Sequence, residues 1–170
     1  MKIQRGEREL SSNDVEEIPK GLIPGEWVFL ADSSAQRKYI AYVNPHAEIF
    51  FKIKILKNID WTYKNSRDES AMAKEVISEL LELAIKKRNV ARLVYGLSDS
   101  LPGLIVDKYK KYILVQVNTA GLDRFRDLIR EVLEKYHPDH LVKFYDNVEY
   151  RKTEILPTHN KEEIEDDLDV

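Results

Sequence analysis

The sequence predicts an α+β protein in which a small β-barrel-like module is followed by a small mixed α/β unit. β-rich runs are concentrated between residues 22 and 56. Two later stretches, 68–88 and 121–137, carry the apolar periodicity of amphipathic helices, and short apolar runs bounded by turn residues lie around them. With 170 residues, the chain is long enough for one full domain or two small ones.

Three strands are expected in the N-terminal part. Pro24-Gly25 predicts a turn before a run at 27–30, and two more β-rich runs follow at 38–43 and 48–56. The last run has an apolar face and a basic face, formed by Ile49, Phe51, Ile53 and Ile55 on one side and by Lys52 and Lys54 on the other. This alternation is typical of a half-buried strand.

A helix is expected after the polar segment 58–67. Asp68 is its predicted N-cap, with Glu69 in the first turn. An apolar stripe at helical spacing consists of Ala73, Val76, Ile77, Leu80, Leu81 and Ala84. The helix is expected to end near residues 86–88, Lys-Lys-Arg, whose charges complement its C-terminal dipole.

The C-terminal half is expected to continue as β-β-β-α-β. The expected elements are a strand at 91–96, a hairpin at 104–109 and 112–118 that turns at Lys110-Lys111, a helix at 121–137 and a strand at 141–146. The predicted inward face of the helix consists of Leu122, Phe125, Leu128, Ile129, Val132 and Tyr136. Pro138 prevents the helix from continuing.

These elements predict a division of the chain into four segments. The β module is expected at 1–57, a linker at 58–67 and the α/β domain at 68–157. The last segment, 158–170, is acidic and lacks a hydrophobic face, so we expect it to be disordered.

Composition excludes several classes of protein. The absence of cysteine rules out a thiol nucleophile, a thiolate metal site and disulfides. No apolar run approaches membrane-spanning length and the N-terminus does not resemble a signal peptide, so a soluble cytoplasmic protein without membrane partners is expected. The net charge is −3, but residues 158–170 hold six acids and one lysine, which leaves 26 basic and 24 acidic residues elsewhere. Nucleic-acid binding would therefore depend on a local basic patch.

A tight turn, Leu101-Pro102-Gly103, precedes one strand of the predicted hairpin. Proline sets φ and glycine tolerates positive φ, while Asp99 between two serines is suited to accept backbone N–H bonds. These features favour a structural role. Asp107 within the following strand is unusual, because aspartate has low β propensity.

The segment ARLVYGLSDSLPGLIVDKY resembles the signature of PUA-containing class I SAM-dependent methyltransferases, which modify cytosine in large-subunit ribosomal RNA. The matching positions are Arg92, Leu93, Val94, Gly96, Ser98, Asp99, Leu101 to Asp107, Lys108 and Tyr109. Residues 42–53, YVNPHAEIFFKI, are similar to the segment that closes the family's PUA barrel. Residues 116–125 and the sequence RKTEILP at 151–157 are similar to two further elements. The similarity runs from about residue 10 to residue 157.

The resemblance implies a PUA-like domain followed by the central α/β domain of that family. It also implies that the SAM-binding domain, with its Gly-rich loop and catalytic cysteine, lies outside this chain, which has no G-x-G-x-G loop. We therefore expect this chain to bind no cofactor. SAM would be bound only if a C-terminal catalytic domain exists. Ile155 stands where the family usually has glycine. Leu10 and Ser11 stand where the family's first strand usually has aromatic and apolar residues. Met72, Ala73 and Leu81 lie in a helix that is commonly rich in arginine in that family.

Two basic–aromatic clusters are candidates for RNA binding. The first lies on the third predicted strand and the loop before it, and comprises Arg37, Lys38, Phe50, Lys52 and Lys54. The second lies at the predicted hairpin tip and comprises Lys108, Tyr109, Lys110 and Lys111. Aromatic side chains can stack on bases while lysines hold phosphates. The alternative is an ordinary solvated strand face and an edge protected by lysines.

Two further pairs complete the candidate set. Arg92 and Asp99 are expected to bind each other, to position an RNA backbone or to face the catalytic domain. Arg151 and Lys152 are expected at the end of the last strand, where the chain would cross into that domain. His137 and His140 are spaced loosely like a metal pair, but a third ligand is missing, so a polar loop is the simpler interpretation. No catalytic constellation is visible.

Three functional hypotheses follow. The first is a non-catalytic module that recognises RNA, with ribosomal RNA as the expected target, as a relative of the N-terminal half of such a methyltransferase with a separate catalytic partner. The second is the N-terminal fragment of a complete RNA methyltransferase. The third is a protein-interaction or dimerisation module, with a seam near residues 59–63, that has lost RNA binding.

Overall fold

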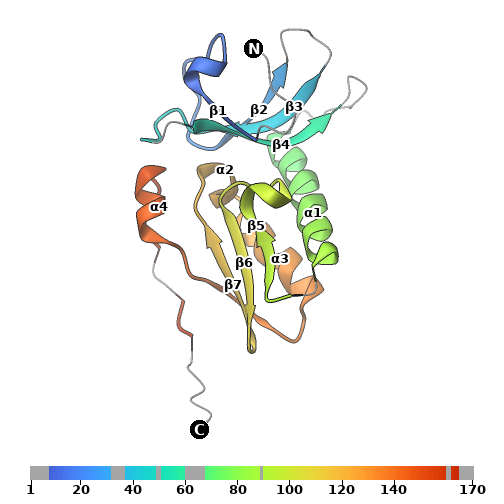
Figure 1. Ribbon diagram of the computed structural model, residues 1–170. Helices are drawn as coiled ribbons and strands as arrows, with labels where there is room; N and C mark the ends of the chain where they lie inside the picture. The colour runs from blue at the N-terminus through green and yellow to red at the C-terminus, as the bar shows by residue number, and fades with distance from the viewer. Residues whose placement is uncertain are drawn as a thin grey trace.

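The computed structural model describes residues 8–31, 37–48, 51–59, 68–88, 90–159 and 162–164. Within these ranges the protein contains two four-stranded sheets. Figure 1 shows the N-terminal sheet lying across one end of the second sheet, with helices packed along one side of the latter. None of the helices in these ranges combines the length and the apolar character required to cross a membrane.

The N-terminal sheet is antiparallel and has the strand order β1-β4-β3-β2. Its strands are β1 (Glu9–Ser11), β2 (Glu26–Ala31), β3 (Lys38–Val43) and β4 (Phe51–Ile59), with a short 3₁₀ helix, η1 (Ser12–Asp14), after β1. Within the described ranges β1 and β2 are the two edges of the sheet and do not pair with each other. The expected barrel-like module is therefore, over the described residues, an open sheet and not a closed barrel.

The prediction that one face of β4 is exposed to solvent was wrong. Both faces of this strand are covered, because Ile53 and Ile55 pack in the cluster of the N-terminal sheet while Leu56 and Ile59 pack toward the second sheet. Lys54 is consequently buried rather than solvated, and its Nζ lies 2.5 Å from the Oε1 of Glu9 on β1.

The second sheet has the order β5-β6-β7-β8, antiparallel except for the parallel pair β7–β8. Its strands are β5 (Arg92–Tyr95), β6 (Leu104–Tyr109), β7 (Tyr112–Val117) and β8 (Leu141–Phe144), with the 3₁₀ helix η2 (Gly96–Asp99) after β5. The predicted hairpin is confirmed as β6–β7. Helices α1 (Glu69–Lys87) and α3 (Arg126–Tyr136) cover one face, and α4 (Val148–Thr153) follows β8.

The first helix matches its prediction. The Asp68 carboxylate accepts the backbone N–H of Ser70 at 3.0 Å, and Lys86 and Lys87 occupy the last turn. The single helix expected at 121–137 is instead broken into α2 (Ala120–Asp123) and α3. The break lies at Arg124, whose guanidinium reaches back to the carbonyl oxygen of Gly25 at 3.1 Å and to Glu69.

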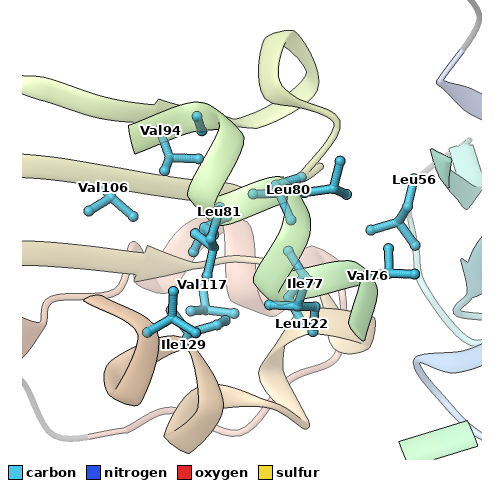
Figure 2. Packing of buried hydrophobic residues seen from close by; sticks show 14 of the residues in the cluster. Leu56, Val76, Ile77, Leu80, Leu81, Val94, Val106, Val117, Leu122 and Ile129 are labelled. Carbon is cyan, nitrogen blue, oxygen red and sulfur yellow. The ribbon is translucent and has the colours of Figure 1, made fainter. Parts of the chain in front are cut away.

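One hydrophobic cluster runs from the N-terminal sheet through α1 into the second sheet. Leu56 of β4 lies beside Val76 of α1, and the same cluster includes Val106 of β6 and Ile129 of α3 (Figure 2). A second, smaller cluster is confined to the N-terminal sheet. The two sheets therefore share a core, and their relative position is set by apolar burial.

Hydrogen bonds at the junction fix this position further. The Tyr42 hydroxyl lies 2.6 Å from the carbonyl oxygen of Pro102, to which it donates, and 2.8 Å from the hydroxyl of Thr119. Burial raises the pKa of Tyr42 well above its ordinary value, so the hydroxyl stays protonated and able to donate. Trp27 donates from Nε1 to the carbonyl oxygen of Gly121 at 3.1 Å. The Leu-Pro-Gly turn thus joins the two sheets.

Part of the acidic C-terminal segment, expected to be disordered, is described and makes specific contacts. Glu162 lies 2.6 Å from the guanidinium of Arg130, and its backbone N–H donates to the carbonyl oxygen of Phe144 at 3.3 Å. These contacts extend the chain along β8, with Glu162 next to α3.

Candidate nucleic-acid interface

The face of the second sheet opposite α1 and α3 carries aromatic, apolar and charged side chains. Because side chains alternate along each strand, the residues next to the core positions point to this side. We call it the open face, and its members are Arg92, Tyr95, Ile105, Asp107, Tyr109, Tyr112, Leu114, Gln116, Leu141 and Lys143. Tyr95, 52% exposed, lies beside Ile105 and Gln116 in one row across the sheet.

Arg92 lies in the next row of the open face and pairs with Asp107. Its Nε lies 2.7 Å from Oδ1 and its Nη2 lies 3.0 Å from Oδ2, directly across the β5–β6 pair. The guanidinium also lies 5.2 Å from the centroid of the Tyr95 ring. This cross-strand ion pair explains an aspartate within a strand.

Asp99 does not bind Arg92, so that expectation was wrong. Its buried carboxylate accepts the backbone N–H of Tyr95 at 2.7 Å and pairs with Arg88 at the end of α1. Lys87 lies 3.9 Å away. The carboxylate thus connects η2 to α1 and helps form the turn that precedes β6, which is a structural role rather than an exposed RNA contact.

The expected cluster at the hairpin tip is divided between the two faces of the sheet. Tyr109 pairs with Tyr112 on the open side, whereas Lys108 pairs with Ile113, whose side chain belongs to the core on the helix side. Lys110 has a φ of 49° and its Nζ lies 5.9 Å from the Tyr109 ring centroid; the Nζ of Lys111 lies 5.5 Å from the Tyr112 ring centroid. The tip lies at the end of the sheet remote from the N-terminal sheet (Figure 1).

The candidates on the N-terminal sheet do not form one patch. Lys38 opposes Ile59, at the far end of the β3–β4 pair from Lys52, so the two lysines lie about 20 Å apart along the strands. The Nζ of Lys38 lies 4.6 Å from the centroid of the Phe29 ring, and that of Lys52 donates to the carbonyl oxygen of Pro45 at 3.0 Å. Arg37 is exposed next to Lys38, and Phe50 lies outside the described residues.

Arg151 is buried in α4 rather than placed at the end of a strand, which corrects the prediction. It is 1% exposed, and its Nη1 lies 2.7 Å from Asp123 and 3.6 Å from Asp146. Arg126 binds the same two aspartates at 3.0 and 2.9 Å. Lys152 is exposed and pairs with Glu149 at 2.8 Å. Arg151 therefore holds α4 against the second sheet and is not available to RNA.

This ionic cluster lowers the pKa of Asp123. Burial alone would favour its neutral form, but hydrogen bonds and charges from Arg151 and Arg126 outweigh burial and hold the pKa of Asp123 below its ordinary value. His159 lies 3.7 Å from the same carboxylate. Sequence reasoning missed the cluster because its members come from α2, α3, α4 and the loop after β8, which periodicity does not relate.

A cleft of about 370 Å³ lies where the two sheets and α4 meet. Its lining includes Tyr95, Ile105, Asn118, Tyr150 and Glu154, together with the Glu9–Lys54 ion pair. The cleft adjoins the Tyr95 end of the open face. Sequence reasoning also missed Asn118 and Glu154; their only signal was their position in two segments that resemble elements of the methyltransferase family.

The two loop histidines lie beside each other just after α3. His137 and His140 contact each other edge to face at 5.8 Å between ring centroids. Burial, with contributions from His140 and Lys108, lowers the pKa of His137. Across the described ranges, no group of three or more histidine and acidic side chains is arranged to bind a metal.

Comparison with known proteins finds sequence similarity to part of ribosomal RNA methyltransferases. No family model matches the chain. Ribosomal RNA large subunit methyltransferase I from Yersinia pseudotuberculosis is 25% identical over 154 residues, which cover 86% of this chain and 37% of the relative. The protein of the same name from Yersinia pestis has the same identity and coverage. The chain therefore spans little more than a third of the length of the curated relatives it matches.

Solved structures agree on the fold. A protein from Streptococcus mutans, assigned as a SAM-dependent methyltransferase, has a TM-score of 0.62 at 19% identity, covering 84% of this chain and 37% of that chain. A second solved structure, of a protein assigned as a methyltransferase and complexed with SAH, has a TM-score of 0.61 at 17% identity and the same coverage. Over most of its length, this chain thus has the fold of a part of these proteins and is similar in sequence to a part of ribosomal RNA large-subunit methyltransferases.

Proposed function

We propose that this chain is a non-catalytic RNA-recognition module, in which a PUA-like N-terminal sheet is joined to a central α/β domain. The observation that carries the proposal is the open face of the second sheet, where the exposed Tyr95 and Tyr109 flank a row that holds Lys143 and the Arg92–Asp107 pair. Similarity to ribosomal RNA methyltransferases supports ribosomal RNA as the partner. The proposal assigns substrate recognition, and not methyl transfer, to these residues.

The open face is suited to a single strand. Tyr95 and Tyr109 lie at opposite ends of β5–β6 and offer ring faces on which bases can stack, while Arg92 and Lys143 lie in the row between them. A six-residue strand such as β6 is about 20 Å long, which accommodates several nucleotides. Sheets that bind single-stranded RNA combine stacking and phosphate contacts in this way.

The charge of the chain predicts how binding responds to salt. With a net charge of −3 and few cations on the open face, we expect two or three phosphate contacts. Each contact contributes a slope of about −0.7 to the logarithmic salt dependence for a single strand, so the total slope should be about −2. Stacking then supplies most of the affinity.

The proposal is tested by the substitution Tyr95→Ala in the full chain. Loss of one stacking platform should weaken binding to single-stranded fragments of large-subunit ribosomal RNA by roughly 1–3 kcal/mol. Fluorescence anisotropy across a salt series measures both the affinity and the slope. Leu83→Ala, which truncates an equally exposed apolar side chain on α1, should leave both unchanged. Absence of binding at low salt, or equal loss in both variants, would contradict the proposal.

A second candidate is that the chain is the N-terminal, substrate-binding fragment of a complete RNA methyltransferase. The relatives that it matches are nearly three times longer than the aligned region, which favours this candidate. Calorimetric titration with S-adenosylmethionine tests what both candidates share: the chain alone should give no saturable heat, and stoichiometric uptake would contradict both. Light scattering on the same samples tests the third hypothesis, a dimer with a seam near residues 59–63, of which 60–63 lie outside the described residues.

A further inference from the structure

The buried carboxylate of Glu154 is positioned to bind a ligand in the cleft. Glu154, the C-cap residue of α4, is 4% exposed. Its Oε2 accepts hydrogen bonds from the Nδ2 of Asn44 at 3.0 Å and from the backbone N–H of Ala120 at 3.4 Å. Among the described residues, the hydrogen bonds of the carboxylate go to Oε2 and none goes to Oε1, while Lys54, which lines the same cleft, is paired with Glu9. A buried carboxylate with unused acceptor capacity favours a donor from a ligand.

Asn118 provides a second, independent observation. Asn118 lines the same cleft and is 8% exposed. The Oδ1 atom is buried and has no hydrogen-bond partner among the described residues. Rotation of the amide presents either its oxygen or its NH₂ group, so Asn118 can serve a ligand atom that is a donor or an acceptor.

Aromatic side chains frame the opening of the cleft. Tyr95 at the end of β5 and Tyr150 on α4 both line it and are exposed. A planar ring entering between them would be able to stack on a tyrosine while its polar edge reaches Glu154 and Asn118. The volume of about 370 Å³ lies within the range of small-ligand sites and exceeds that of a single base.

We propose that the cleft binds one unpaired RNA base carrying an exocyclic amino group, which donates to the Oε1 of Glu154. The proposal rests on the proposed RNA-binding function and adds base selectivity to it. Adenine, cytosine and guanine carry such a group, and Asn118 matches the ring nitrogen beside it in each case. Uracil has no amino group, and carbonyl oxygens flank its N3–H on both sides, so the carboxylate repels it.

The test compares RNA probes that differ at one position. The probes are a short uridine tract and the same tract with a single central adenosine, cytidine or guanosine. The full chain should bind the three substituted tracts roughly ten- to hundredfold more tightly than the uridine tract, as expected for one hydrogen bond to a charged group.

The variant Glu154→Gln should change the selectivity rather than only weaken binding. Glutamine can keep its oxygen toward Asn44 and Ala120 and present its NH₂ group to the cleft, where it would donate to the O4 of uracil. The preference for amino-bearing bases should therefore disappear or reverse. Glu149→Gln removes the same charge from an exposed position on α4 and should keep the wild-type preference. Tyr150→Ala, at an exposed site, should weaken only the substituted tracts.

The outcomes separate the two proposals. Equal affinity for all four probes, unchanged in Glu154→Gln, overturns the base-selective cleft and leaves RNA binding by the open face intact. Absence of binding to every probe at low salt overturns the proposed function and the cleft with it. The urea midpoint of each variant shows whether the substitution impairs folding. If Glu154→Gln does so, the comparison uses Tyr150→Ala instead. An unchanged base preference in Tyr150→Ala would then contradict base binding in the cleft.

Discussion

At the scale of single residues, Ile155 shows how the backbone of this fold constrains side-chain choice. It has a φ of 54°, in the left-handed region that disfavours β-branched residues. Ile155 follows Glu154 directly and its backbone N–H donates to the carbonyl oxygen of Lys152, which closes the end of α4. Glycine, usual in the family that the sequence resembles, adopts this conformation without strain.

The substitution Ile155→Gly should therefore stabilise the protein. The side chain is 56% exposed, so little apolar burial is lost, and relief of strain should exceed the entropic cost of glycine by about 0.5–1 kcal/mol. Urea unfolding measures the change. Val90→Gly, also at an exposed apolar position but without positive φ, should instead destabilise by a similar amount. Destabilisation by both substitutions would show that strain at Ile155 is not significant.

At the scale of elements, the turn Leu101-Pro102-Gly103 makes contacts that hold the two sheets together. Gly103 has a φ of 80°, and a Cβ on it would lie 2.3 Å from the Cγ2 of Thr119. Thr119 donates from its hydroxyl to the carbonyl oxygen of Pro102 at 2.9 Å and contacts Tyr42 of β3. A shift of Thr119 would thus disturb the junction of the sheets.

We expect Gly103→Ala to destabilise the protein by about 2–4 kcal/mol, because steric overlap adds to the backbone strain. Gly21→Ala provides the matched control: Gly21 has a φ of 89°, and the added methyl group would have no atom within 4 Å, so this change should cost only about 1 kcal/mol. The double substitution Gly103→Ala with Thr119→Ser removes the Cγ2 atom and keeps the hydroxyl, and should recover part of the loss. Urea unfolding measures all three variants, and equal costs at the two glycines would contradict the steric explanation.

The elements also show which structural predictions succeed from the sequence. The cap and end of α1, and the β6–β7 hairpin, depend on contacts within a few residues and were predicted correctly. The break between α2 and α3 was missed because it depends on Arg124 reaching Gly25 and Glu69, which lie far away in the sequence. Local periodicity at 121–137 continues through the break and gives no sign of it.

At the scale of the whole molecule, ion pairs that are buried around Asp123 and partly exposed at Glu69 connect distant segments and make stability depend on pH. Arg151 and Arg126 join Asp123 and Asp146 beneath α4, and Arg124 joins Glu69 of α1 to the region after α2. For Asp123 and Glu69 alike, burial opposes ionisation, but the arginines and hydrogen bonds prevail and lower the pKa of each carboxyl.

Because the folded-state pKa of Asp123 is lowered, its ionised form stabilises the fold above the unfolded-state pKa of about 3.9, and this stabilisation is lost as the pH falls through the folded-state pKa. Wild-type unfolding free energy should therefore fall steeply below about pH 4. Asp123→Asn should cost about 2–3 kcal/mol at pH 7 and differ less from wild type in acid. Urea unfolding from about pH 7 to pH 2 measures both curves; a difference that stays constant with pH would contradict the assignment.

By itself, the sequence determined the type and order of most elements, the absence of cysteine chemistry and a resemblance to RNA methyltransferases. Only the tertiary structure decided which charged residues are exposed. Lys54, Asp99 and Arg151 look like surface cations and anions in the sequence, yet they are buried in ion pairs with partners 11 to 45 residues away. The same distant packing brings Asn118 and Glu154 to one cleft with Tyr95. Burial and pairing of charge depend on which elements meet in space, and a linear pattern does not contain that information.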